Sequence, residues 1–73
     1  VDHDCTLGDH VHIAPGVTLS GGVSVGSGAM IGAGATVIQN IVVGEGAFVA
    51  AGATVVSDVD ARARVGGTPS RKF

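Results

Sequence analysis

The sequence contains neither tryptophan nor tyrosine, and only two phenylalanines. Aromatic side chains are the surfaces on which the bases of single-stranded nucleic acids stack, so their scarcity argues against that class of ligand. Basic residues are also few, because four Lys and Arg stand against six Asp and Glu, with a formal net charge of -2. We therefore expect neither a nucleic acid nor an anionic membrane surface as the main partner.

The chain has a single cysteine, Cys5, which excludes an internal disulfide framework. We expect Cys5 to lie in the core as a small apolar residue. There is no run of 18 consecutive apolar residues and no signal segment, and a cytoplasmic protein is expected. A chain of 73 residues that begins at Val1 inside a repeat indicates missing upstream coils, and so short a chain buries too little surface to be very stable without a neighbour.

What the sequence has in abundance is a six-residue repeat. The segment from Val1 to Asp60 divides into ten consecutive units without an insertion. The first position is always aliphatic, the fourth is Gly, Asn or Asp in nine units of ten, and the fifth is always Cys, Ala, Val or Ile. Self-similarity at a fixed period is the signature of a solenoid.

Each unit combines a short strand with a corner. Because side chains alternate along a strand, positions five, six, one and two of successive units point in, out, in and out. Positions three and four then form the corner, and the fourth needs a positive φ, which Gly adopts freely and Asn or Asp more easily than most residues. Most glycines are therefore expected to be corner residues and not a phosphate-binding loop.

Three strands and three corners close a coil of 18 residues, with parallel strands stacked about 4.8 Å apart. The sequence therefore predicts an all-β fold, a parallel β-helix of about three coils over residues 1–60, followed by a capping segment over residues 61–73. Residues 18 apart form aliphatic columns inside the coils: Val1/Leu19/Val37/Val55, Leu7/Val25/Val43 and Ile13/Ile31/Val49.

Several large apolar side chains occupy outward positions in this scheme. Exposed apolar residues on several coils are unusual for a monomer and suggest lateral packing against other subunits. They are Met30 and Phe48, in one column with His12, and also Ile38, Val42 and Val56.

Four segments resemble the hexapeptide-repeat acyltransferases: His3-Asp4-Cys5, His12 to Val17, Leu19 to Val23 and Val65 to Ser70. Over all 73 residues the chain is similar to the C-terminal part of the NeuD and PglD group, which are sialic acid O-acetyltransferases and nucleotide-sugar N-acetyltransferases. The resemblance implies a left-handed β-helix, although the period itself does not determine the hand and crossovers are usually right-handed.

The same resemblance implies a function and partners. Members of that group are homotrimers that hold acetyl-CoA in the groove between adjacent β-helices, and they usually carry an N-terminal acceptor-binding α/β domain, which this sequence lacks. The implied reaction moves an acetyl group from acetyl-CoA to an amine or hydroxyl of a nucleotide-linked or sialic-type sugar.

Acetyl transfer needs a base for the acceptor and a hydrogen-bond donor for the developing oxyanion. By its match to the family motif, His3 is the expected base, a role that suits histidine because its ordinary pKa is about 6.5. Asp4 either orients His3 or serves as a corner residue. His12 is expected to bind the thioester carbonyl or the acceptor, and only a trimer groove would bring it to His3 of another subunit. His10 is expected to be a structural corner residue.

The coenzyme is expected to meet small and basic residues. Gly21 stands one coil above His3, and its N–H is the expected donor to the thioester carbonyl, because the missing side chain allows close approach. Small outward residues would line a groove for the pantetheine arm: Gly32, Ala33, Ala50 and Ala51. The basic residues Arg62, Arg64, Arg71 and Lys72 are candidates for the coenzyme's phosphates, although a solvated basic tail explains any one of them equally well.

Three other interpretations remain open. A β-helix of this kind can act as a non-catalytic trimerising scaffold. Gamma-class carbonic anhydrases share the fold and bind zinc through histidines of successive coils, whereas His3, His10 and His12 lie in one coil, so we expect no metal. An ice-binding surface is suggested by the outward threonines at 18, 36 and 54. Such a surface needs a second parallel row of threonines, and the residues in that row here are Ser20, Ile38 and Val56.

Overall fold

The computed structural model describes residues 5–72, and every regular element in that part of the chain is a β-strand. Strands β1 to β9 each contain the sixth position of one unit and the first position of the next, as the alternation predicted. The strands are β1 (Thr6–Leu7), β2 (His12–Ile13), β3 (Thr18–Leu19), β4 (Ser24–Val25), β5 (Met30–Ile31), β6 (Thr36–Val37), β7 (Val42–Val43), β8 (Phe48–Val49), β9 (Thr54–Val55), β10 (Arg64–Gly66) and β11 (Arg71–Lys72).

The strands form three sheets that make up the sides of a prism. Their orders are β1-β4-β7, β2-β5-β8-β10-β11 and β3-β6-β9, so that up to β9 each strand pairs with the third strand after it. All pairs up to β10 are parallel, and Leu7 pairs with Val25, which pairs with Val43, at a spacing of 18 residues. The predicted parallel β-helix of about three coils is confirmed.

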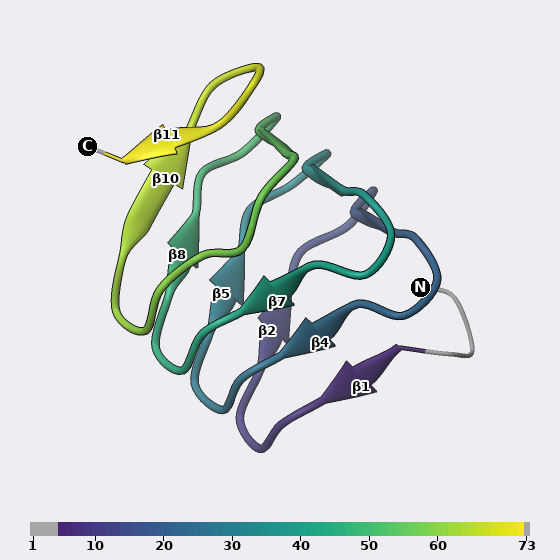
Figure 1. The fold of residues 1–73 in the computed structure, drawn as a ribbon, viewed down its shortest axis with the longest axis vertical. Coiled ribbons are helices and arrows are strands. Elements are labelled where there is room, and N and C mark those ends of the chain that lie inside the picture. The colour runs from purple at the N-terminus through teal and green to yellow at the C-terminus, as the bar shows by residue number, and fades with distance from the viewer. Residues whose placement is uncertain (1–4, 73) are drawn as a thin grey trace.

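The coil is left-handed. In Figure 1 strands β1, β4 and β7 cross the front of the molecule, while β2, β5 and β8 return, fainter, behind them. Successive coils advance from the purple N-terminal end to the yellow C-terminal end, and this combination of directions gives a left-handed turn. The hand agrees with the one that the family resemblance implied.

The interior of the prism is aliphatic, as the columns predicted. Val37 and Val55 are fully buried, as are Ile31, Val43 and Val49. The first described coil differs, because no coil of the described chain packs on its N-terminal side. Leu7, which the columns placed inside, is therefore 44% exposed, and Ile13 is only partly buried.

Most corners have the predicted backbone conformation. Gly16 and Gly22 have φ of +78° and +76°, and the non-glycine corners His10 and Asn40 have φ of +58° and +61°. Asp58 is the fourth residue of the tenth unit, and the expectation of a positive φ there was wrong. The left-handed corner of the last coil is instead Arg62, with φ of +61°.

The last coil is shorter than the others, which explains this shift. Val59 bridges Val43 and Val65 pairs with Val49, so the column spacing falls from 18 to 16 residues after β9. A carboxylate replaces a backbone carbonyl at the shortened corner: the N–H of Val42 donates to Oδ1 of Asp58 at 2.8 Å. In a complete coil the corresponding N–H donates to a carbonyl oxygen, as Ser24 does to Ile41 at 2.9 Å.

We expect Asp58→Ala to destabilise the protein by about 1 kcal/mol, because the Val42 N–H loses its acceptor. Asp58→Asn should retain most of the stability, since its amide oxygen can accept the same hydrogen bond. Urea unfolding of both variants and the parent measures the difference. Equal stability of Asp58→Ala and the parent would show that water replaces the carboxylate at no cost.

The C-terminal segment folds back over the final coil. Strand β11 pairs antiparallel with β10, the N–H of Thr54 donates to the carbonyl of Gly67 at 3.0 Å, and the N–H of Ser70 donates to the carbonyl of Thr54 at 2.8 Å. These bonds satisfy strand edges that would otherwise be open. Because β10 also extends the sheet of the coils, the division of the chain at residue 60 stays a prediction.

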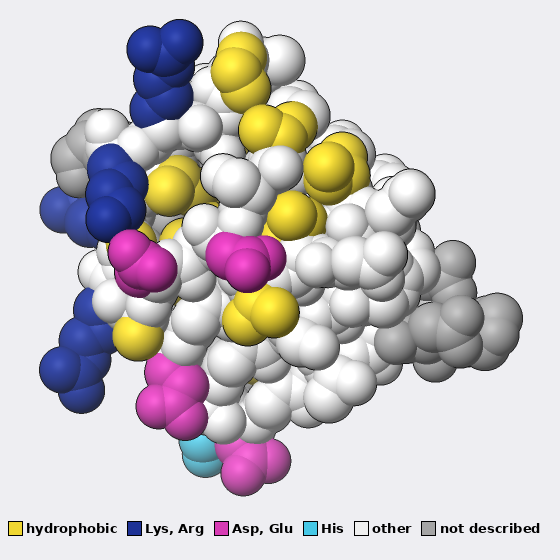
Figure 2. Space-filling view, in the orientation of Figure 1, with side chains coloured by type: hydrophobic (Ala, Val, Ile, Leu, Met, Phe, Trp, Pro, Cys, Tyr) yellow, Lys and Arg dark blue, Asp and Glu magenta, His cyan; other side chains and the backbone are white. Residues whose placement is uncertain are grey.

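The outward apolar side chains are exposed as predicted, with one exception. Met30, Ile38, Val42 and Val56 are between 38% and 49% exposed, whereas Phe48 is half-buried. Figure 2 shows apolar side chains at several places on the surface of the prism. Cys5, expected in the core, is only partly buried, and its thiol donates to the carbonyl of Ser20 with Sγ and O 3.2 Å apart.

Candidate functional site

The two residues at the centre of the predicted chemistry, His3 and Asp4, lie outside the described residues. Their roles as base and orienting acid stay predictions. The residues that the sequence placed around them are described, and they occupy one side, two separate corners and one end of the prism.

His12 lies on β2 and points outward from the five-stranded sheet. It pairs with Met30 on β5, and both side chains are exposed. Within residues 5–72 the imidazole forms no hydrogen bond and no ion pair, so both ring nitrogens are open to a ligand or to another chain.

Gly21 lies at the corner between β3 and β4, which is the corner between the two sheets that do not contain His12. Its carbonyl accepts the N–H of Asn40 at 3.0 Å, whereas its own N–H donates to no backbone carbonyl of residues 5–72. The neighbouring Gly22 leaves the space that the Asn40 carboxamide fills. Gly21 therefore offers a free backbone donor on a corner that hydrogen bonding holds in place.

The four small residues predicted to line a groove are brought together. Gly32 and Ala33 form the corner after β5, and Ala50 and Ala51 form the same corner one coil later. A Cβ on Gly32 would lie 2.5 Å from the backbone N of Ala51, so glycine is needed there for the coils to stack. This corner follows the five-stranded sheet that carries His12, whereas the corner of Gly21 lies between the other two sheets.

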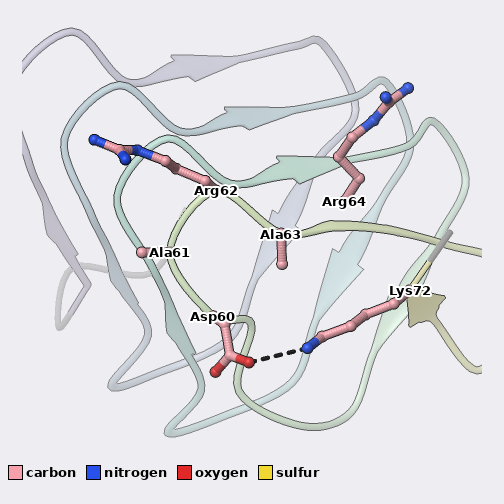
Figure 3. A pocket seen from close by; sticks show the side chains of 6 residues that line it. All are labelled: Asp60, Ala61, Arg62, Ala63, Arg64 and Lys72. Carbon is pink, nitrogen blue, oxygen red and sulfur yellow. Dashed lines mark hydrogen bonds and ion pairs between the residues drawn. The ribbon is translucent and has the colours of Figure 1, made fainter.

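Three of the four predicted basic residues line one pocket at the C-terminal end of the prism. This shallow, open pocket has a volume of about 420 Å³ and is lined by Asp60, Ala61, Arg62, Ala63, Arg64 and Lys72 (Figure 3). Arg71, on β11, is exposed but does not line it. Figure 2 shows the Lys and Arg side chains gathered at this end of the molecule.

The pocket contains one acidic residue that sequence reasoning missed. Nζ of Lys72 lies 3.1 Å from Oδ2 of Asp60, and Figure 3 shows the Lys72 side chain directed at that carboxylate while Arg62 and Arg64 extend away in other directions. The six-residue spacing treated Asp60 as the last residue of a tenth unit. Because the last coil is two residues shorter, Val59 takes the first position of a unit and Asp60 takes the second.

Two further observations concern the described part of the chain. Residues 5–72 hold no group of three His, Cys, Asp or Glu side chains placed to bind a metal ion. In the same residues there is no helix long and apolar enough to cross a membrane.

Comparison with known families agrees with this geometry. Residues 22–57 match the family described as bacterial transferase hexapeptide (six repeats). This region belongs to that family, and the same six-residue repeat continues on both sides of it. No curated protein matches the chain.

Solved structures give a closer comparison. The acetyltransferase domain of PglB from Neisseria gonorrhoeae is 42% identical, with a TM-score of 0.98 over 100% of this chain and 36% of that one. PerB from Caulobacter crescentus, solved with CoA and GDP-perosamine, is 42% identical, with a TM-score of 0.98 over 100% of this chain and 35% of that one. A serine O-acetyltransferase from Brucella melitensis is 38% identical, with a TM-score of 0.96 over 100% of this chain and 31% of that one. The chain thus spans about a third of the length of the proteins it resembles.

Proposed function

We propose that the protein carrying this chain is an acetyltransferase that moves acetyl from acetyl-CoA to an amine or hydroxyl of a nucleotide-linked or sialic-type sugar. The observation that carries the proposal is the 42% identity, over the whole of this chain, to PerB and to the PglB acetyltransferase domain. Solved structures of these two proteins contain CoA with GDP-perosamine and acetyl-CoA, respectively.

The proposed catalytic groups come from two subunits of a homotrimer. His3 acts as the general base for the acceptor and Asp4 orients it, while His12 of a neighbouring subunit binds the thioester carbonyl or the acceptor. Two features support the shared site: His12 lies on the five-stranded side of the prism while Gly21 lies at the corner between the other two sheets, and the exposed apolar side chains of Met30, Ile38 and Val42 offer surface for lateral packing.

The proposed coenzyme site lies in the groove between two adjacent prisms, with Gly21 from one subunit and the small residues from its neighbour, and it runs towards the C-terminal end. The N–H of Gly21 donates to the thioester oxygen, where negative charge develops during attack, and a fixed backbone donor stabilises that charge without having to reorient. The small residues at the corners after β5 and β8 leave room for the pantetheine arm. The basic residues Arg62, Arg64, Arg71 and Lys72 meet the phosphates.

The acceptor has a second candidate. The 38% identity to a serine O-acetyltransferase extends the set of possible acceptors to the hydroxyl of a free amino acid. Both acceptors use the same donor and the same base, so the two candidates differ in the acceptor alone.

We expect the purified protein to bind acetyl-CoA saturably and to release CoA when an amino-sugar nucleotide is added, because the base and the carbonyl donor need an acceptor to complete the reaction. Calorimetric titration measures the binding, and a thiol assay measures the release. Parallel reactions with an amino-sugar nucleotide, a sialic acid and serine identify the acceptor class. A protein that assembles as a trimer without binding acetyl-CoA would be a scaffold, and the proposal would be withdrawn.

A further inference from the structure

The second position of one corner column is restricted to glycine by the stacking of the coils. A Cβ on Gly8 would lie 2.6 Å from the backbone N of Ser27, and a Cβ on Gly26 would lie 2.6 Å from the backbone N of Glu45. A Cβ on Gly44 would collide in the same way with the backbone of Ala61. A side chain at this position would therefore have to pass through the coil above it.

Asp60 continues this column in the last coil. The carbonyl of Val59, just before it, accepts the N–H of Gly44 at 2.7 Å, which stacks Asp60 and Ala61 above Gly44. No further coil of the described chain covers Asp60, so a side chain fits there. It projects from the end of the prism into the pocket that also holds Arg62, Arg64 and Lys72.

The contact that Asp60 makes is weak and accessible. Its Oδ2 lies 3.1 Å from Nζ of Lys72, and the two side chains are 78% and 69% exposed. An exposed ion pair of this kind contributes little to stability, because water and salt screen the attraction. A more strongly charged anion that enters the pocket can therefore replace Asp60 as the partner of Lys72 without disturbing the fold.

The charge of the pocket favours such an anion. Among the described residues Arg62, Arg64 and Lys72 line it with Asp60, and Lys72 is the basic side chain directed at the carboxylate (Figure 3). A phosphate group carries more charge than a carboxylate and offers more acceptor oxygens, so it is the better partner for an ammonium group. A bound phosphate would also be repelled by Asp60 unless that carboxylate moved away from Lys72.

We propose that Asp60 is a built-in competitor for the anionic ligand of this pocket: it holds Lys72 when the pocket is empty, and a phosphate group displaces it on binding. Asp60 thereby lowers the affinity for the ligand and eases its release. The proposal rests on the proposed function for the identity of the ligand, a phosphate of the coenzyme, but not for the exchange itself.

The test is a calorimetric titration of the Asp60→Asn protein with CoA at low ionic strength. We expect an affinity about fivefold higher than that of the parent, the effect of one unit charge at close range in water. The gain should shrink as salt is added. Asp9→Asn is the matched control, because it removes the same charge from the first described coil, far from the pocket, and should leave the affinity unchanged.

A double-mutant comparison separates exchange from general repulsion. In the Lys72→Gln background, Asp60→Asn should give little further gain, because the residue for which Asp60 competes is gone. An equal gain in both backgrounds, or no gain in either while the parent binds CoA, would overturn the proposal. Dephospho-CoA and inorganic phosphate, titrated separately, distinguish the 3′-phosphate, the diphosphate and a free phosphate as the displacing group.

The two proposals fail in distinguishable ways. If the parent protein does not bind CoA but Asp60→Asn strengthens the binding of inorganic phosphate, the exchange stands and the acetyltransferase assignment falls. If CoA binds and Asp60→Asn changes nothing, the assignment stands and the exchange is wrong.

Discussion

Replacing His3 with alanine is expected to lower the turnover of acetyl transfer about a hundredfold or more, with the stability of the protein unchanged. A positioned general base contributes on the order of a hundredfold to ten-thousandfold to such reactions. His3 is the third residue of its unit, and the repeat predicts an outward corner side chain at that position, so alanine should leave no cavity in the core. The measurements are kcat and KM for acetyl-CoA with saturating acceptor, together with urea unfolding.

The matched control is His10→Gly. His10 is exposed and sits at a corner with φ of +58°, a conformation that glycine adopts without strain. This variant also removes an exposed histidine from the same coil, and it should keep full turnover. Undiminished turnover of His3→Ala would remove His3 as the base and transfer the role to His12, which is exposed on β2.

The second large effect is expected at Gly32. Substitution by alanine should destabilise the protein by about 3 kcal/mol, at the upper end of the usual cost of overpacking. The added Cβ would lie 2.5 Å from the backbone N and 2.9 Å from the Cα of Ala51 in the next coil. Backbone atoms at a stacked corner cannot move aside as the end of a flexible side chain can, so the two coils must separate locally. Urea unfolding with a constant m-value measures the loss.

Gly34→Ala separates this clash from backbone strain. Gly34 has φ of +72°, and a Cβ there meets no atom within 4 Å. Its substitution should cost about 1 to 2 kcal/mol, from the left-handed conformation alone. Gly32 has no such φ, so its cost comes from coil stacking. A Gly32→Ala protein as stable as the parent would show that the coils can shift apart freely.

The regular part of the fold was predictable because it depends on a local rule. Alternation along each strand directs Val37 and Val55 inward and Met30 and Val42 outward, and the buried and exposed fractions agree. The same rule placed the left-handed corners at Gly16 and Asn40. The hand of the coil was not predictable from the repeat, because the period is the same for either hand. It was inferred from the resemblance to the hexapeptide-repeat acyltransferases.

The candidate site was predictable only in part. Resemblance named His12, Gly21 and the basic residues as site residues, but it did not say that His12 lies on one side of the prism and Gly21 at the corner between the other two sheets. The ends of the solenoid were predicted least well. Leu7 follows the core pattern and is nevertheless 44% exposed, and Asp58 follows the corner pattern but instead accepts a hydrogen bond from Val42.

The sequence by itself determined which way each side chain of the repeat points and where the chain turns, since both follow from a six-residue period and the φ that each corner demands. Only the tertiary structure decided what lies above and below each residue, because stacking depends on the coil length, which falls from 18 to 16 residues near the end. That shortening puts Asp60 in a column otherwise held by Gly26 and Gly44, at the last coil of the described chain, within 3.1 Å of Lys72. The residue that we expect to regulate binding thus owes its position to the end of the repeat.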